Sequence, residues 1–297
     1  SERAVAATEI SIEQLPKVFE SHEITGVISK STSNKLGLPI IPVVAGAGDQ
    51  AAGAIGSSVI NVDDASLVLG TSGVIFIVTE GFLPNPMQGI HAFCHAMPNT
   101  WHQMAVILSA ASAIDWCANI TGFDSPKQAY DAAEKKGHSD DVFFLPYLNG
   151  ERTPHNNPYA KSMFQGLKST TDRAAIIHAS MEGVAFALKD GFDALIDGGG
   201  KCDTITVIGG GSRSRYWGKI IANCLDKTLI YRDDSDIGPA KGAALLAQSG
   251  INNSKIETIN EAAPIIEAIE PKNNHVQKYK EKIDTWRKLY HATKKFN

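Results

Sequence analysis

One carboxylate stands where a strand is expected to end and a helix to begin, in a stretch that could perform acid–base chemistry. Asp49 follows Gly46 and Gly48 and precedes the small, apolar run 51–55. A carboxylate at this point can cap the helix by accepting backbone N–H bonds. It can also act as a general base that the same cap aims into a cleft. Because aspartate caps are common, this stretch alone favours the cap.

Two further glycine-rich turns follow expected strands. They read Gly70-Thr71-Ser72-Gly73 and Gly209-Gly210-Gly211-Ser212. Glycine lets a backbone approach a ligand closely, and unpaired N–H groups and hydroxyls bind phosphate oxygens. A single turn of this kind is usually only a tight turn, but three in one chain favour phosphate binding. The sequence has no Walker A motif, so a nucleotide would bind without a P-loop.

Four potential metal ligands lie close together in the sequence: His91, Cys94, His95 and His102. They fall in strand-like segments, where a zinc site would need ligands from opposite faces of the sheet. We therefore expect polar sheet positions and no metal site here. Glu151 and Arg152 could form an internal ion pair, or Arg152 could line a cleft that binds an anion or a polyol.

Composition excludes several classes of protein. The 297 residues are 43% hydrophobic and 20% charged, with a net charge of −4. This balance does not indicate a nucleic-acid or membrane partner, and no apolar run reaches the ~18 residues of a membrane span. The four cysteines are scattered, which is typical of reduced thiols and a cytoplasmic location. The sequence begins at Ser1 without a Met, as a fragment would.

The elements that must position these residues alternate between strands and helices. Apolar and β-branched runs predict a buried strand over 39–45, a hairpin over 66–78, and strands over 89–97, 101–107, 142–148, 204–208 and 228–231. Helical patterns cover 108–120, 125–136, 172–195, 215–225, 241–248 and 273–295, with a turn and a short helix within 24–34. An antiparallel meander followed by helical crossovers predicts an α/β protein with a mixed sheet.

Together these motifs resemble the FGGY family of carbohydrate kinases, over roughly residues 37–248. The stretches that carry the resemblance are 46–56, 69–74, 91–97, 108–112, 145–158, 182–183, 208–213 and 238–244. Within the family, the loop from Gly150 to Pro158 is most similar to that of xylulose kinases.

The resemblance implies an actin/Hsp70/hexokinase-like (ribonuclease H-like) fold, with a mixed β-sheet flanked by helices in each of two lobes. This chain would be mainly the C-terminal lobe. We expect residues 1–58 to end the N-terminal, sugar-binding lobe, 59–270 to form the nucleotide-binding lobe, and 271–297 to form a C-terminal helix. The family's Asp-x-Gly-Thr phosphate loop and Met-His sugar contact do not occur in these residues, so we expect little turnover from the chain alone.

The resemblance also implies a role for each matching residue, with ATP and Mg²⁺ as cofactors. Asp49 matches the general base that accepts the proton of the attacking sugar hydroxyl, and Gln50 would bind the sugar. The remaining matches concern the nucleotide: Gly70, Thr71, Ser72 and Gly73 as the second phosphate loop; Gly209, Gly210, Gly211 and Ser212 as the adenosine segment, with Arg213 and Tyr216 nearby; Gly238 and Pro239 beside the base.

The implied reaction is ATP-dependent phosphorylation of a ketopentose, D-xylulose to D-xylulose 5-phosphate. Another FGGY kinase, acting on ribulose, fuculose, gluconate or glycerol, stays open because much of the sugar pocket is missing. So does a non-catalytic nucleotide-binding module, although such a module has no need for Asp49. The sugar and ATP are the expected partners, and a homodimer is compatible with the sequence.

Overall fold

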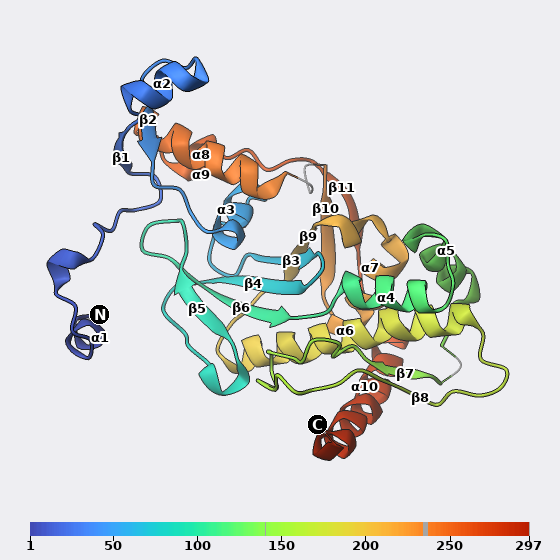
Figure 1. The fold of residues 1–297 in the computed structure, drawn as a ribbon. Helices are drawn as coiled ribbons and strands as arrows, with labels where there is room; N and C mark the ends of the chain where they lie inside the picture. Colours follow the sequence, from blue (N-terminus) through green and yellow to red (C-terminus); the bar gives the residue numbers. More distant parts are fainter. Residues whose placement is uncertain (140, 234–236, 297) are drawn as a thin grey trace.

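A seven-stranded mixed sheet forms the centre of the molecule (Figure 1). The computed structural model describes residues 1–139, 141–233 and 237–296. The strand order is β11-β10-β9-β3-β4-β6-β5. The strands are β3 (Ala65–Leu69), β4 (Gly73–Thr79), β5 (His91–Cys94), β6 (Trp101–Ile107), β9 (Thr204–Ile208), β10 (Thr228–Arg232) and β11 (Ile265–Ile269).

The direction of each strand follows its connection. β3, β4, β6 and β5 are neighbours in this order and pair antiparallel, with β3–β4 and β5–β6 as hairpins. β9 lies between β3 and β10 and runs parallel to both, and α7 forms the crossover from β9 to β10. The crossovers expected from the sequence are confirmed, but the expected simple meander is wrong, because β4 pairs with β6 and β5 lies at the edge beyond β6. β11, which pairs antiparallel with β10, was missed.

Helices cover both faces of the sheet, which explains why β4 is buried at every position. Leu67, Ile75 and Ile77 belong to the large core beneath α6. The alternate residues Val74 and Phe76 pack with Ala54 of α3 on the other face. The helices are α3 (Asp49–Gly56), α4 (Ala111–Ile120), α5 (Pro126–Lys136), α6 (Arg173–Asp197), α7 (Arg215–Leu225), α8 (Gly238–Asn252), α9 (Ile256–Ile259) and α10 (Asn273–Thr293).

Several helix starts form at the caps that the sequence suggests. Ser125 accepts a bond from Gln128 N, with Pro126 in the first turn of α5. Asp172 accepts a bond from Ala175 N at the start of the 25-residue α6. α6 passes so close to the short strand β7 that a Cβ on Gly183 would lie 2.3 Å from the carbonyl oxygen of Phe144. Gly183 therefore permits close packing against a strand.

The C-terminal helix closes the core on the α6 side. Trp286 of α10 is fully buried, and its Nε1 donates to the carbonyl oxygen of Phe144 at 2.7 Å. Trp217 of α7 is also buried, and its Nε1 donates to the carbonyl oxygen of Met181 at 3.1 Å. A two-stranded sheet lies beside them, formed by β7 (Phe143–Leu145) and β8 (Met163–Gln165).

The first 45 residues contain one small sheet. β1 (Ile24–Val27) pairs antiparallel with β2 (Pro42–Val44), and α2 (Lys30–Leu36) connects them. The prediction of a buried strand over 39–45 is wrong. The strand spans three residues and is mostly exposed, because a two-stranded sheet has no second layer on it. The remaining short elements are α1 (Glu2–Ala6), η1 (Ile12–Gln14), η2 (Pro86–Gln88), η3 (Gly210–Arg213) and η4 (Lys294–Phe296).

Candidate functional site

The tip of the β3–β4 hairpin is fastened to the start of α4. The carbonyl oxygen of Thr71 accepts bonds from Ala110 N at 2.9 Å and Ser112 Oγ at 2.7 Å, and that of Gly70 accepts from Ala111 N at 3.1 Å. Tip carbonyls therefore satisfy N–H groups that a helix start leaves free. The Thr71 side chain is exposed, and its hydroxyl makes no hydrogen bond to the residues that the structure describes.

The second glycine turn packs against the end of β3. Gly209 has a φ of 89°, and a Cβ on it would lie 2.9 Å from the carbonyl oxygen of Leu69. A Cβ on Gly211 would lie 2.8 Å from the Leu69 Cβ and 2.9 Å from Trp217. Side chains at either position would push the turn off the strand, so glycine brings this turn beside the hairpin tip.

Both turns line one cavity of about 850 Å³, here called the glycine-loop cavity. Its walls come from the hairpin tip, α4, α5, η3 and the start of α7. The lining residues that the sequence predicted are Gly70, Thr71, Gly210, Gly211, Arg213 and Tyr216. The sequence separates the two turns widely, and the β3–β9 pairing brings them together.

Four other predicted residues support these turns and are outside the lining. Gly73 is buried, and a Cβ there would meet Leu188 at 3.0 Å and Ala110 at 3.2 Å. Ser212 is buried, and its N–H donates to the carbonyl oxygen of Gly209 at 3.0 Å. Ser72 accepts a bond from Gly70 N at its carbonyl oxygen. Thus only part of each glycine-rich motif faces the cavity.

Sequence reasoning missed the helical wall of this cavity. Asp115 of α4 and Tyr130 of α5 line it, and burial raises the pKa of both side chains. Lys127, Asp131 and Glu134 recur at helical spacing along α5 and line it too. The sequence does contain a signal for this wall, namely the charged face of α5. From the sequence alone, that pattern predicts a helix and gives no indication of a cavity.

Asp49 is the first residue of α3, and Gly48 is its N-cap. The prediction that the Asp49 side chain caps the helix is therefore wrong, since the helix has no side-chain cap bond. The exposed Asp49 carboxylate has no hydrogen bond or ion pair with another described residue. Gln50 follows it and is half-buried. A carboxylate at the first turn suits the helix dipole and is left available to a ligand.

Gly238 and Pro239 begin α8 and lie against α3. A Cβ on Gly56 would lie 1.8 Å from the carbonyl oxygen of Gly238, and one on Gly53 would lie 3.6 Å from Pro239. Neither α8 residue belongs to the lining of the glycine-loop cavity. The α8 start is thus placed beside the helix that carries Asp49.

The histidines near β5 and β6 form an aromatic cluster. His102 stacks on Phe76 at 4.3 Å, and His95 meets the same ring edge-on at 5.4 Å. His95 Nδ1 accepts a bond from Met97 N, so Nε2 carries the proton and donates to the Val59 carbonyl oxygen at 3.2 Å. Burial lowers the pKa of His95 to about 4 and that of His102 to about 3. Both rings are therefore neutral core groups near neutral pH.

Glu151 is buried in the loop that follows β7. Its Oε1 accepts bonds from Leu108 N at 3.0 Å and from Arg152 N at 2.8 Å, while Oε2 has no partner among the described residues. Burial raises the pKa of Glu151 to about 8. The Arg152 guanidinium lies 3.0 Å from His91 Nε2. Glu151 therefore contacts the Arg152 backbone, and the structure gives no side-chain ion pair between these two residues.

Two negative findings apply to the described parts of the chain. They contain no group of three or more His, Cys, Asp or Glu side chains that could hold a metal ion. None of their helices has both the length and the apolar character to cross a bilayer.

The mixed sheet with helical crossovers is the architecture of an actin- and hexokinase-like α/β protein. The model of the C-terminal domain of the FGGY family of carbohydrate kinases matches residues 65–250, and the model of its N-terminal domain matches residues 1–56. The chain belongs to the FGGY family of carbohydrate kinases.

Xylulose kinases are among its relatives. The chain is 43% identical to the xylulose kinase of Escherichia coli K12 over 98% of its length and 60% of that protein. It is 40% identical to the xylulose kinase of Klebsiella pneumoniae over 99% of its length and 61% of that protein. The crystal structure of a xyloylose kinase from Brucella ovis superposes with a TM-score of 0.93 at 37% identity, covering all of this chain and 62% of that one. The chain thus spans about three-fifths of these relatives.

Proposed function

We propose that this chain supplies the nucleotide site and the general base of an ATP-dependent sugar kinase. One observation carries the proposal: Thr71 at the hairpin tip and Gly210 and Gly211 at the β9 end line the same cavity. Glycine turns with a free hydroxyl at strand ends suit the phosphates of a nucleotide. The cavity volume of about 850 Å³ is that of a typical site for a molecule of this size.

Asp49 is the proposed base for the sugar hydroxyl. Its carboxylate is exposed and has no partner among the described residues, and α3 holds its backbone against the central sheet. It would accept the hydroxyl proton as the oxygen attacks the terminal phosphorus of ATP, and ADP would leave. Such transfer depends mainly on positioning and charge stabilisation. Gln50 would then hydrogen-bond the sugar.

Mg²⁺ is part of the proposed reaction, but no residue is assigned to it. The described residues offer no cluster of three acidic or imidazole ligands. In kinases Mg²⁺ keeps several waters and binds largely through substrate phosphates with one or two carboxylates. The chemistry it supplies is neutralisation of phosphate charge.

D-xylulose is the proposed substrate. Support comes from relatives named xylulose kinase at 43% and 40% identity, which match nearly all of this chain. In this proposal residues 1–58 end the sugar-binding lobe, 59–270 bind the nucleotide and 271–297 add the terminal helix. The alternative of a nucleotide-binding module without catalysis is an outcome of the test below.

The test has two parts. Calorimetry on the chain itself should detect ADP binding, and Gly211→Val should abolish it because the side chain would push η3 away from Leu69. Phosphoryl transfer from Mg-ATP by the natural-length protein should prefer D-xylulose over ribulose, fuculose, gluconate and glycerol. Asp49→Asn should lower kcat by at least ~100-fold with ADP binding unchanged. Binding of ADP without transfer to any sugar would leave a binding module and refute the role of Asp49.

A further inference from the structure

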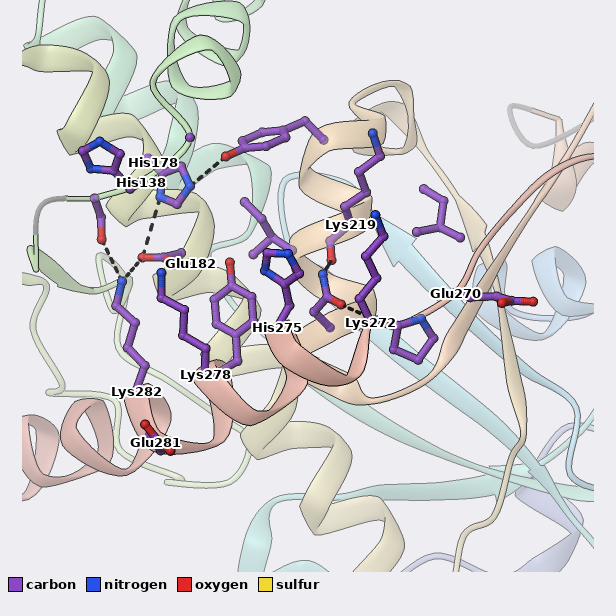
Figure 2. A pocket seen from close by; sticks show the side chains of 18 of the residues that line it. His138, His178, Glu182, Lys219, Glu270, Lys272, His275, Lys278, Glu281 and Lys282 are labelled. Carbon is purple, nitrogen blue, oxygen red and sulfur yellow. Dashed lines mark hydrogen bonds and ion pairs between the residues drawn. The ribbon is translucent and has the colours of Figure 1, made fainter.

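A second cavity, of about 1060 Å³, lies between α6, α7, β11 and α10; we call it the C-terminal cavity (Figure 2). Tyr216 lines both this cavity and the glycine-loop cavity. None of the proposed catalytic steps uses the C-terminal cavity. Its volume is just above the ~300–1,000 Å³ of ordinary ligand pockets, so it can accept a small metabolite.

One face of α10 presents basic groups to this cavity. His275, Lys278 and Lys282 recur at spacings of three and four residues, which places them on the same side of the helix. Figure 2 shows Lys278 and Lys282 on the side of α10 that faces Glu182, and Glu281 on the opposite side. These basic side chains of α10 therefore line one wall of the C-terminal cavity.

The charges deepest in the cavity are already paired. Lys282 Nζ lies 2.5 Å from Glu182 Oε2 and 2.7 Å from Ser139 Oγ. Glu267, another lining acid, is held by Arg215 Nε at 2.7 Å. These pairs neutralise two of the lining carboxylates. Neither carboxylate is therefore available to pair with the outer lysines.

Three lysines around the rim have no such partner. The ammonium groups of Lys219, Lys272 and Lys278 make no hydrogen bond or ion pair with the described residues, and all three side chains line the cavity. The remaining lining acids are Asp141, Glu270 and Glu281, all exposed. Figure 2 shows Glu270 and Glu281 directed away from Lys278. The rim therefore carries three lysines whose positive charges are not paired within the described residues.

A buried donor completes the site. His178 is 2% exposed, and its Nε2 lies 2.9 Å from the Tyr216 hydroxyl. When that hydroxyl donates to Nε2, the ring proton is on Nδ1, which has no hydrogen-bond partner and lies 3.7 Å from Glu182 Oε2. A donor without an acceptor is costly inside a protein, and a ligand oxygen would relieve that cost.

We propose that the C-terminal cavity binds a small phosphate-bearing anion through Lys219, Lys272, Lys278 and His275, with His178 at its inner wall. Lysine ammonium groups bind phosphate as point charges and tolerate different ligand shapes. The site is separate from the glycine-loop cavity and does not depend on the proposed role of Asp49. Tyr216 joins the two, so an occupant at His178 would contact a residue of the nucleotide wall.

The experiment titrates the whole chain with inorganic phosphate and, separately, with D-xylulose 5-phosphate. Calorimetry measures affinity, and NMR follows the ring protons of His275. We expect saturable binding that shifts these protons. The double variant Lys272→Gln/Lys278→Gln should bind at least ~10-fold more weakly, because it loses two charged contacts to the anion. Lys280→Gln is the control, because it removes the same charge from α10 outside the cavity.

Tighter binding of the sugar phosphate would identify an organic phosphate as the ligand, and equal affinities would identify phosphate itself; both support the site. Lack of saturable binding would overturn the proposal. Equal affinity of the double variant and the parent chain would also overturn it, since the anion would then lie elsewhere. Thermal unfolding of each variant, expected to match the parent because these lysines are exposed, excludes misfolding as the cause.

Discussion

Gly242 of α8 lies directly against the carbonyl group of Ala52 in α3: a Cβ at Gly242 would be 1.8 Å from that oxygen. Gly56 makes the reciprocal contact with Gly238 at the same distance. The two helices therefore touch backbone to backbone. Because α3 carries Asp49 at its first turn, this contact fixes the proposed base relative to α8.

Gly242→Ala should force the two helices apart. We expect the free energy of unfolding to fall by ~2–4 kcal/mol, as for overpacking against a rigid backbone. Urea unfolding measures the loss, and kcat of the natural-length kinase should fall with it. Gly26→Ala is the matched control, because a Cβ there meets no atom within 4 Å. Equal stability of the two variants would contradict the close contact.

Glu151 should make the protein less stable as pH rises. Burial raises its pKa to about 8 in the folded state, against 4.5 as the ordinary value. The folded protein thus binds the proton more tightly than the unfolded chain. Its stabilising contribution is complete below pH 4.5 and is lost as pH rises to 8. Glu151→Gln keeps an acceptor for Leu108 N and should flatten this part of the pH–stability profile.

The control for Glu151 is the exposed Glu281→Gln, which should leave the slope unchanged. Urea unfolding between pH 5 and pH 8 is the measurement. A Glu151→Gln variant that loses stability with pH as steeply as the parent would show that the buried carboxyl does not titrate in this range.

The aromatic cluster should respond to pH in the opposite direction. Burial lowers the pKa of His102 to about 3, so the unfolded chain takes up a proton near 6.5 before the folded protein does. The stabilising contribution is complete above pH 6.5 and is lost as the pH falls towards 3. In the parent chain the free energy of unfolding should fall as the pH is lowered. His102→Phe should reduce this fall by up to ~1.4 kcal/mol per pH unit, measured by urea unfolding between pH 6.5 and 4. The exposed His275→Gln should leave it unchanged.

Lys282 stabilises the charged form of the buried Glu182 carboxylate. Burial alone would raise the Glu182 pKa, but the neighbouring His178 ring and the charge of Lys282 lower it to about 2. Lys282→Met removes that charge and should cost ~3–5 kcal/mol in urea unfolding. Lys280→Met breaks only an exposed pair with Asp226 and should cost less than ~1 kcal/mol. Adding Glu182→Gln to Lys282→Met should recover stability; failure to recover would locate the loss elsewhere.

The sequence predicts helices and strands correctly where a capping residue or a tight turn marks their ends. Ser125, Asp172 and the Gly70–Gly73 tip placed α5, α6 and the hairpin correctly. The sequence does not predict β11, because Ile265–Ile269 is a short, mostly exposed edge strand. The stretch around Asp49, taken alone, favours a side-chain cap, but Gly48 is the N-cap and begins the helix without any side chain.

The candidate site could be predicted only in part from the sequence. Its walls form when segments far apart in the sequence come together. The glycine motifs marked two turns, but nothing local indicates that Gly73 and Ser212 face inward. The C-terminal cavity was harder to see, since Glu182 and Lys282 meet across a hundred residues. The available signals were the four-residue spacing of His178 and Glu182 and the basic face of α10.

The insertion of β9 between β3 and β10 sets an order of assembly. β3 pairs with its sequence neighbour β4, and β4 pairs with the nearby β6, whereas Ser66 of β3 pairs with Thr206 of β9 from much later in the chain. Non-local pairs form slowly because loop-closure entropy comes first. Until β9 arrives, the apolar strand β3 has an open edge that can pair with another copy of the chain. Aggregation during synthesis should therefore begin at β3, in the centre of the finished sheet.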